Sequence, residues 1–333
     1  MKPDSRIEKA GLNSLSTLAG EYRFKNRKAS QDRGYQFLNE ECQTMGIIKK
    51  AIFPVAGNGT RLLPATKVLP KEILPVLDKP AIQYVVEDAV KAEIEQIIFI
   101  TSRGKNSLED HFDRSFELET YLKERQKNDL LKKVRSVSKL AKFSYVHQPV
   151  QLGDGHAIMC ARHLVGEEPV LIVFGDTLYD APIPISKQVM DAYENFKAPI
   201  IGLAEVSEQD VNKYGIIKGL DLGAGNVKIT GFVEKPDLGK APSNLAAVGI
   251  YVITSEVFEC LDQVKKKNTD ELKLANVFKY MVEKGYEIYG RKLKGEWLDI
   301  GNKLNYTKAF IKFGLKDEEI SADVKKFIQD LCH

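Results

Sequence analysis

The sequence is poor in the features that mark secreted, membrane-spanning and nucleic-acid-binding proteins. Its four cysteines form no CxxC or Cys/His spacing, which argues against a disulfide framework or a zinc site. No apolar run approaches the roughly 20 residues that span a bilayer, and the first residues lack the apolar segment of a signal peptide. The formal net charge is only +3, so no field over the whole molecule attracts a polyanion. We expect a cytoplasmic protein whose partners include no membrane and no nucleic acid.

Two common glycine-rich motifs are missing as well. Gly57 and Gly59 begin a GxGxxG pattern, but Leu62 stands where a dinucleotide-binding loop needs a third small residue. The Gly-Lys-Ser/Thr ending of a P-loop is also absent. No hexapeptide repeat follows the last helical region, which excludes a β-helical acetyltransferase domain. A nicotinamide-dependent dehydrogenase therefore becomes a remote alternative.

The composition that is present is that of an ordinary globular protein, with 43% hydrophobic and 29% charged residues in a chain of 333. Residues 1–45 differ from the rest because they are polar, with only scattered apolar positions. They predict a flexible N-terminal extension, which is either an arm used in assembly or the result of a start codon assigned too early. Residues 46–333 are expected to form a single domain with a C-terminal helical region.

Strand and helix patterns alternate along this domain, and the alternation predicts an α/β fold. We expect a Rossmann-like mixed, mainly parallel sheet flanked by helices. Strands are predicted at residues 51–55, 96–101, 142–147, 169–174, 200–205, 214–218, 231–234, 246–253 and 286–293. Helices are predicted at 82–92, 155–164, 185–195, 256–265, 274–284 and 304–331, with one helix or a helix pair at 112–140.

The segment 51–75 carries the clearest chemical signal. An apolar strand ends there at Gly57 and Gly59, where missing side chains let backbone N–H groups approach an anion. Three cations follow between prolines: Arg61, Lys67 and Lys71. A GxG pair alone is often only a tight turn, but this set of charges suits a triphosphate or a pyrophosphate leaving group.

The stretch 148–156 is a candidate site for a base. The Gln148 amide offers both a donor and an acceptor to a pyrimidine edge, and glycines precede the predicted helix. A helix-entry turn with Asp154 near the N-cap explains the same pattern without any ligand. His156 is interpreted as a structural histidine rather than a general base.

Acidic residues at the ends of later strands are candidate ligands for a metal and a sugar. Asp176 follows an apolar strand and Asp299 lies in a second acidic turn, and Mg²⁺ prefers one or two carboxylates together with phosphate oxygens. Glu234 and Lys235 offer an acceptor for sugar hydroxyls and a cation for a phosphate. Each of these residues alone is commonly part of a turn, and their combination with the glycine loop favours a site.

The glycine-loop segment resembles the signature of nucleotidyltransferases that join a nucleoside triphosphate to a sugar 1-phosphate. The matching residues 57–80 read GNGTRLLPATKVLPKEILPVLDKP. The resemblance extends from residue 47 to about residue 327 and includes the stretches GDGHAI, GFVEKP and WLDIGNKLNY. Residues 105–125 are similar to the bacterial UTP:glucose-1-phosphate uridylyltransferases and separate them from the thymidylyltransferases.

The resemblance implies an enzyme that uses Mg²⁺ to transfer the uridylyl group of UTP to glucose 1-phosphate. It implies catalytic roles for Arg61, Lys71, Asp176 and Lys235, with Asp176 and Asp299 as Mg²⁺ ligands. The implied substrate-binding residues are Ala56, Gly57, Gly59, Glu72, Gln148, Gly153, Gly215, Glu234 and Gly249. Members of that family are usually dimers or tetramers, so we expect a homodimer or a homotetramer.

Three positions depart from the pattern of the family. This chain reads LGDGH at 152–156 where the family usually shows GLGH, so Asp154 places an acid near the expected base. Residues 270–276 read DELKLAN instead of DEIQLTD, and Ile300 replaces a cysteine or threonine. The resemblance therefore predicts the type of reaction more firmly than the selectivity for base and sugar. The alternatives are dTTP or a purine triphosphate as substrate, and a non-catalytic subunit that binds a sugar nucleotide.

Overall fold

The computed structural model describes residues 48–267 and 271–331. The predicted flexible extension at 1–45 lies outside the described residues. The chain from Ile48 onward forms one compact unit. Within the described part of the chain, every helix is too short or too polar to span a bilayer.

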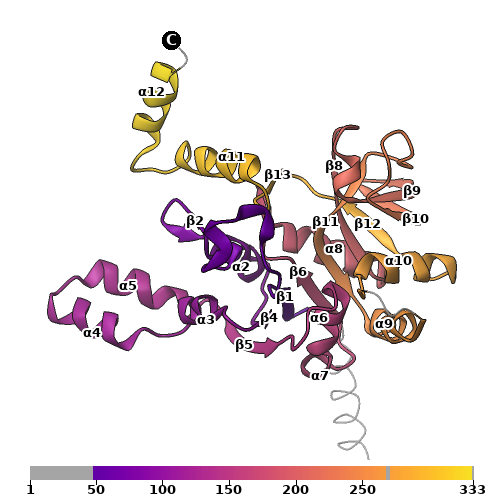
Figure 1. The fold of residues 1–333 in the computed structure, drawn as a ribbon, viewed down its shortest axis with the longest axis horizontal. Coiled ribbons are helices and arrows are strands. Elements are labelled where there is room, and N and C mark those ends of the chain that lie inside the picture. The colour runs from indigo at the N-terminus through magenta and orange to yellow at the C-terminus, as the bar shows by residue number, and fades with distance from the viewer. Residues whose placement is uncertain (1–47, 268–270, 332–333) are drawn as a thin grey trace, which may run out of the picture. The chain divides into compact units, whose positions relative to one another are not determined.

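A nine-stranded sheet runs through this unit (Figure 1). Its order is β5 (Lys142–His147), β4 (Gln96–Thr101), β1 (Lys50–Pro54), β6 (Val170–Val173), β11 (Leu245–Ile253), β8 (Ile200–Glu205), β12 (Tyr289–Lys292), β10 (Asn226–Glu234) and β9 (Gly215–Gly223). The first four strands are parallel and β12 is parallel to β8, whereas β11, β10 and β9 make antiparallel pairs. The predicted mixed α/β sheet is confirmed, although antiparallel pairing takes a larger share than expected.

The hairpin of β9 and β10 accounts for much of that larger share. Sequence patterns predicted two short strands here, at 214–218 and 231–234. In the structure the strands continue to a tight connection at Ala224 and Gly225, whose φ angles of 52° and 81° suit the turn of a two-residue hairpin. Glycines and exposed polar residues interrupt the apolar pattern of both strands, which is why their full length was not predicted.

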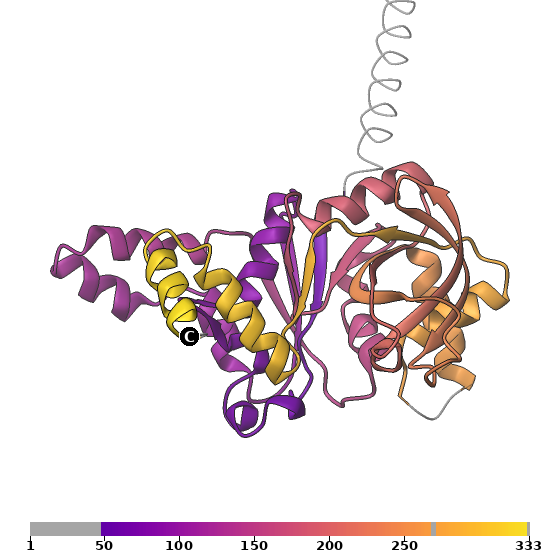
Figure 2. The same ribbon diagram turned by 90° about the horizontal axis from the view of Figure 1, so that it is seen from above.

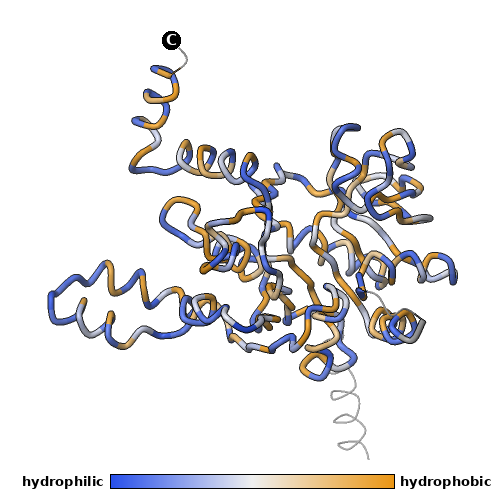
Figure 3. Tube along the Cα trace, in the orientation of Figure 1, coloured by the Kyte–Doolittle hydropathy of each residue, from blue (hydrophilic) through white to orange (hydrophobic). Residues whose placement is uncertain are grey.

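Two apolar clusters cover the two faces of the sheet. Phe53 and Phe99 pack on one face with α2 (Ala81–Lys91) and α8 (Ile185–Phe196). Ile52 and Ile98 pack on the other face, because successive side chains of a strand point to opposite sides. The second face is covered by α6 (Asp154–Cys160), α7 (Arg162–Val165), α9 (Ser255–Lys267) and α10 (Leu274–Glu283). The central strands are therefore nearly continuous in hydrophobic colour (Figure 3).

The charged region predicted as a helix or helix pair at 112–140 forms a hairpin of two helices. These are α4 (Phe116–Glu124) and α5 (Asn128–Val137), which follow the short α3 (Asn106–Phe112) and project away from the sheet (Figures 1 and 2). Glu119 is buried between them and accepts hydrogen bonds from Arg114 and Arg135 at distances of 2.7–3.0 Å. This ion cluster joins the two helices where they share few apolar residues.

Short strands complete the unit, and two of them, β7 (Thr177–Asp180) and β13 (Glu296–Asp299), bring Asp176 and Asp299 close together. β7 pairs antiparallel with β13, and β2 (Pro75–Val76) pairs with β3 (Lys79–Pro80). The helical region predicted at 304–331 divides into α11 (Lys303–Gly314) and α12 (Ser321–Leu331). Asp317 accepts hydrogen bonds from two backbone N–H groups in the turn between them.

Candidate active site

The loop that follows β1 is held in shape by side-chain hydrogen bonds. Gly59 has a φ of 62°, and its carbonyl accepts a hydrogen bond of 2.8 Å from Thr66 Oγ1. Asn58 and Gln151 exchange two amide hydrogen bonds of 2.8 and 3.0 Å, and Gln151 also donates to the Ala56 carbonyl at 2.9 Å. The loop is therefore tied to the segment 148–153, which lies more than 90 residues further along the chain.

A cavity of about 310 Å³ opens between these two segments, and we call it the loop cavity. Its lining includes seven of the predicted site residues: Ala56, Gly57, Lys71, Glu72, Gln148, Gly153 and Asp176. Pro54, Gln151, Asp154, Ala157, Phe174 and Glu271 complete it. Short 3-10 turns at Thr60–Leu62, Ala65–Lys67 and Lys71–Ile73 form the path from the glycines to Lys71.

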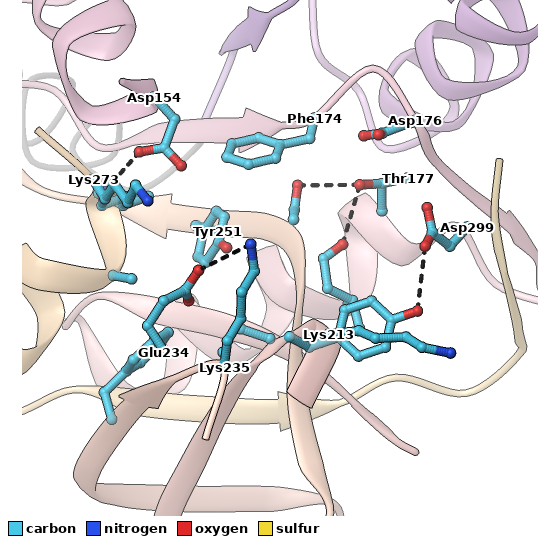
Figure 4. Close-up of a pocket in the computed structure, with 18 of the residues that line it drawn as sticks. Asp154, Phe174, Asp176, Thr177, Lys213, Glu234, Lys235, Tyr251, Lys273 and Asp299 are labelled. Atoms are coloured by element: carbon cyan, nitrogen blue, oxygen red, sulfur yellow. Dashed lines mark hydrogen bonds and ion pairs between the residues drawn. The ribbon is translucent and has the colours of Figure 1, made fainter. Parts of the chain in front are cut away.

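A second cavity of about 240 Å³, the sheet cavity, lies over the start of β9, the end of β10 and the middle of β11 (Figure 4). The predicted site residues in its lining are Arg61, Asp176, Gly215, Glu234, Lys235, Gly249 and Asp299. Asp154, Phe174 and Asp176 line both cavities, which are therefore adjacent. Gly59 and Lys67, which both belong to the described part of the chain, line neither. The cationic set that the sequence predicted is thus reduced to Arg61 and Lys71.

Lys71 and Asp176 form an ion pair at the junction of the two cavities. The Lys71 Nζ lies 2.5 Å from Asp176 Oδ2. Burial opposes the ionisation of both groups, but their mutual attraction and the neighbouring charges outweigh it. The pKa of Lys71 is raised by Asp176 and Glu72, and the pKa of Asp176 is lowered by Lys71. The positive charge of Arg61 contributes to the low pKa of Asp176. The junction therefore holds one ammonium and one carboxylate in their charged forms.

A second ion pair, between Glu72 and Lys105, lies next to this junction. Glu72 is only 1% exposed, and its Oε2 lies 3.0 Å from the Nζ of the buried Lys105. Lys105 also donates a hydrogen bond to the Val55 carbonyl at the end of β1. Burial lowers the pKa of Lys105, and the carboxylate of Glu72 opposes that effect. Glu72, a predicted substrate-binding residue, lines the loop cavity, but its charge is already compensated by Lys105, whose role was not predicted.

The pairing of β7 with β13 brings the two predicted metal ligands together. Thr177, which follows Asp176, pairs directly with Asp299 in the antiparallel register. A Cβ built on Gly301 would lie 2.9 Å from Asp299 Oδ1 and 3.2 Å from Asp176 Oδ2, so both carboxylates border the same small space. Both carboxylates also line the sheet cavity, and Mg²⁺ prefers one or two carboxylates together with phosphate oxygens. The residues present therefore fit that ion.

The sheet cavity is closely packed around its predicted glycines. Gly249 has a φ of 74°, and a Cβ there would approach Thr177 Oγ1 to 2.6 Å. A Cβ on Gly215 would lie 3.0 Å from Glu234 Oε2, so only glycine leaves room at both positions. Glu234 and Lys235 lie on the opposite side of the cavity from Phe174 and Asp176 (Figure 4). The Lys235 Nζ is 3.9 Å from Glu234 Oε1.

A backbone contact with the segment before α10 shapes the border between the two cavities. Gly153 has a φ of 98°, and a Cβ there would lie 2.4 Å from the Leu272 carbonyl oxygen. Asp154 Oδ1 accepts hydrogen bonds from the backbone N–H groups of Gly155 and Leu274, at 2.7 and 2.8 Å. Burial raises the pKa of Asp154 despite these donors. The acid that departs from the family pattern thus links the first turns of α6 and α10.

The lining of the sheet cavity also includes Tyr214, the neighbour of the predicted Gly215, and several residues that were not predicted. Tyr214 donates a hydrogen bond of 3.2 Å to Asp299 Oδ2, and its ring lies against Trp297 with 4.8 Å between the centroids. Phe174, Thr177, Lys213 and Lys273 also line the cavity. Tyr214 beside a glycine was the one local signal, and the remaining residues come together only through the pairing of distant strands.

Comparison with known proteins gives a consistent family assignment. Residues 50–314 match the family model described as Nucleotidyl transferase. A UTP--glucose-1-phosphate uridylyltransferase of Staphylococcus epidermidis is 45% identical over 284 residues, which are 85% of this chain and 98% of the relative. The enzyme of the same name from Staphylococcus haemolyticus is 44% identical over the same shares of the two chains.

Solved structures agree with this assignment. A UDP-glucose pyrophosphorylase from Acinetobacter baumannii has a TM-score of 0.79 and 37% identity, and the match covers 85% of this chain and 99% of that one. A UDP-glucose pyrophosphorylase complexed with UDP-glucose has a TM-score of 0.73 and 38% identity, covering 81% of this chain and 100% of that one. The chain belongs to the nucleotidyl transferase family.

Proposed function

We propose that this chain transfers the uridylyl group of UTP to glucose 1-phosphate and releases pyrophosphate, giving UDP-glucose. The observation that carries the proposal is the meeting of two cavities at Asp176, whose carboxylate is paired with Lys71. The loop cavity, with its glycines and Gln148, suits UTP, and the sheet cavity suits the sugar phosphate. Relatives that are 43–45% identical carry the name of this reaction.

The reaction is a single in-line displacement. A phosphate oxygen of glucose 1-phosphate attacks the α-phosphorus of UTP, the bond to the bridging oxygen breaks, and pyrophosphate leaves. Lys71 and Arg61 stabilise charge on the triphosphate, and Lys235 orients the sugar phosphate. Glu234 accepts hydrogen bonds from sugar hydroxyls. No covalent intermediate with a side chain is required, so catalysis consists of positioning and charge stabilisation.

The cofactor of the proposed reaction is Mg²⁺, held by Asp176 and Asp299. Their two carboxylates border one space at the junction of the cavities, which supports this assignment. When bound, the ion neutralises phosphate charge and acts as a Lewis acid. Lys71 keeps Asp176 ionised and therefore available as a ligand.

Pyrophosphate release tests the function directly. The enzyme is incubated with Mg²⁺ and UTP, dTTP, ATP or GTP, each with and without glucose 1-phosphate. Sugar-dependent release that is fastest with UTP is the expected result. Faster release with dTTP or a purine triphosphate would keep the mechanism and change the substrate. Binding of UTP or UDP-glucose without release would favour the non-catalytic subunit.

We also propose a cytoplasmic homodimer or homotetramer. Large apolar side chains remain exposed on the last two helices, among them Phe310 and Ile311 on α11 and Phe327 and Leu331 on α12. Burying them against a second copy would remove apolar surface from water. Light scattering coupled to size exclusion measures the mass in solution, and a 37.4 kDa species at all concentrations would contradict the proposal. Fractionation of cells with an antibody to the chain tests the location.

A further inference from the structure

Gln148 lies in the loop cavity with its amide already engaged. Gln148 directly follows β5 and is only 6% exposed. The Nε2 lies 3.0 Å from the Gly153 carbonyl oxygen and 3.1 Å from His156 Nδ1. Among the described residues, no hydrogen bond reaches the Oε1 of this amide. One end of the amide is therefore held by the protein, and the other end remains for a ligand.

The hydrogen-bonding chemistry of Gly153 and His156 determines which end of the Gln148 amide is the NH₂ and which is the oxygen. A backbone carbonyl can only accept a hydrogen bond, so the group that faces Gly153 O is the NH₂ of Gln148. The second hydrogen of that NH₂ points to His156 Nδ1, which must then be unprotonated and accept it. Both donors of the amide are used, and Oε1 offers an acceptor. A rotated amide would place Oε1 against the Gly153 carbonyl and leave two acceptors facing each other.

The surroundings of His156 favour the neutral ring that this arrangement requires. His156 lies in α6, two residues after the helix begins, and is partly buried. Burial lowers the pKa of His156, and the positive charge of Lys265 on α9 acts in the same direction. At neutral pH the Nδ1 lone pair is therefore available to Gln148.

We propose that His156 is a positioning residue which, together with the Gly153 carbonyl, presents Gln148 Oε1 as a fixed acceptor and so selects the base. Uracil and thymine carry an N–H at position 3 and can donate to this oxygen. Cytosine carries an unprotonated ring nitrogen there and would place an acceptor against an acceptor. The inference deepens the proposed function, because it rests on the loop cavity holding the base of the triphosphate. It predicts that CTP is rejected through a residue that need not touch the nucleotide.

The test is the ratio of kcat/KM for UTP to kcat/KM for CTP, with glucose 1-phosphate and Mg²⁺. His156→Leu removes the acceptor, and His156→Asn keeps one near the position of Nδ1. We expect His156→Leu to lower the ratio roughly five- to tenfold, the size of one neutral hydrogen bond, and His156→Asn to stay within about twofold of the wild-type ratio. A purely structural role would reduce both rates by the same factor, and an unchanged ratio in His156→Leu would overturn the inference.

Two controls keep the test decisive. If His156→Leu fails to fold, as judged by its circular dichroism and melting temperature, His156→Phe fills the ring volume without the acceptor and takes its place. If the wild-type protein releases no pyrophosphate, the proposed function fails. The dissociation constants of UTP and CTP, measured by calorimetry on the same variants, then test the base selection on its own: a lowered CTP-to-UTP ratio in the variant supports it, and an unchanged ratio rejects it.

Discussion

The Nζ of Lys71 lies 2.5 Å from Asp176 Oδ2, at the point where the loop cavity and the sheet cavity meet. Lys71 comes from a 3-10 turn after β1 and Asp176 from the loop after β6, so the contact joins two neighbouring parallel strands at their carboxyl ends. Ligands of open α/β sheets collect at this edge. In the proposed reaction, the pair marks the reaction centre.

Replacing Lys71 by Met should lower kcat/KM by roughly 10²–10³, because one preorganised charge at the reaction centre is lost. Lys67→Met provides a matched control, since Lys67 lies in the same segment but is exposed and lines neither cavity. It should retain nearly full activity. Equal losses in the two variants would show that the segment acts through general charge rather than through the Lys71 contact. Steady-state pyrophosphate release measures both.

Asp299→Asn should raise the Mg²⁺ concentration needed for half-maximal activity, because a neutral amide is a weaker ligand than a carboxylate. The Tyr214 hydroxyl can still donate to the amide oxygen, so the packing should be kept. Removal of the metal with EDTA should abolish turnover, and added Mg²⁺ should restore it. An Asp299→Asn variant with an unaltered Mg²⁺ titration would remove this residue from the metal site.

Lys105→Met should destabilise the fold by about 3–5 kcal/mol, because it leaves the buried carboxylate of Glu72 without a partner. The double variant Lys105→Met/Glu72→Gln should recover part of this loss. Lys133→Met serves as the comparison, since its pair with Asp78 is exposed and should contribute less than about 1 kcal/mol. Urea unfolding curves give all three values. A loss for Lys105→Met no larger than that for Lys133→Met would contradict the buried-pair interpretation.

Gly153→Ala and Gly57→Ala should separate folding from binding. Alanine at 153 would be strained at a φ of 98° and would meet the Leu272 carbonyl, so we expect a loss of about 1–3 kcal/mol. A Cβ at Gly57 meets nothing within 4 Å, so this variant should keep its melting temperature. Its KM for UTP should nevertheless rise, because the methyl group enters the loop cavity. If the KM stays unchanged, the base or phosphate does not lie against Gly57.

The α4–α5 hairpin should lose stability in acid. Hydrogen bonds from Arg114 and Arg135 lower the pKa of Glu119 to about 2, against an ordinary value of 4.5. The stabilisation by the ionised carboxylate is complete above pH 4.5 and is lost as the pH falls towards 2. The melting temperature of Glu119→Gln should lie below that of the wild type at pH 7, and the gap should narrow towards pH 3. Glu117→Gln, an exposed carboxylate on the same helix, should show no such change.

The sequence predicted the parts of the site that are local in the chain. The glycines, Arg61 and Lys71 lie within one short segment, and their spacing alone indicated an anion site. The parallel strands that support this loop were equally clear, since both faces are buried and their residues form unbroken apolar runs.

The remaining parts depend on contacts between distant segments. The β7–β13 pair joins residues more than 100 positions apart, and neither strand is long or apolar enough to be predicted. Lys105 pairs with Glu72 because a buried carboxylate needs a partner, and the burial of Glu72 depends on the tertiary structure. Lys67 and Lys71 carry the same charge and lie in successive 3-10 turns, but only Lys71 lines the loop cavity. The sequence could not distinguish them because the path of these turns decides which lysine reaches the cavity.

The sharing of Asp154, Phe174 and Asp176 by both cavities has an entropic consequence for turnover. In the proposed reaction, UTP and glucose 1-phosphate each lose translational and rotational freedom separately when they bind, whereas UDP-glucose would fill both cavities as a single molecule. The nucleotide sugar should therefore bind more tightly than glucose 1-phosphate and inhibit the forward reaction. The geometry that would bring the substrates together should thus make the enzyme sensitive to the accumulation of its own product, which competes with both substrates for the two cavities.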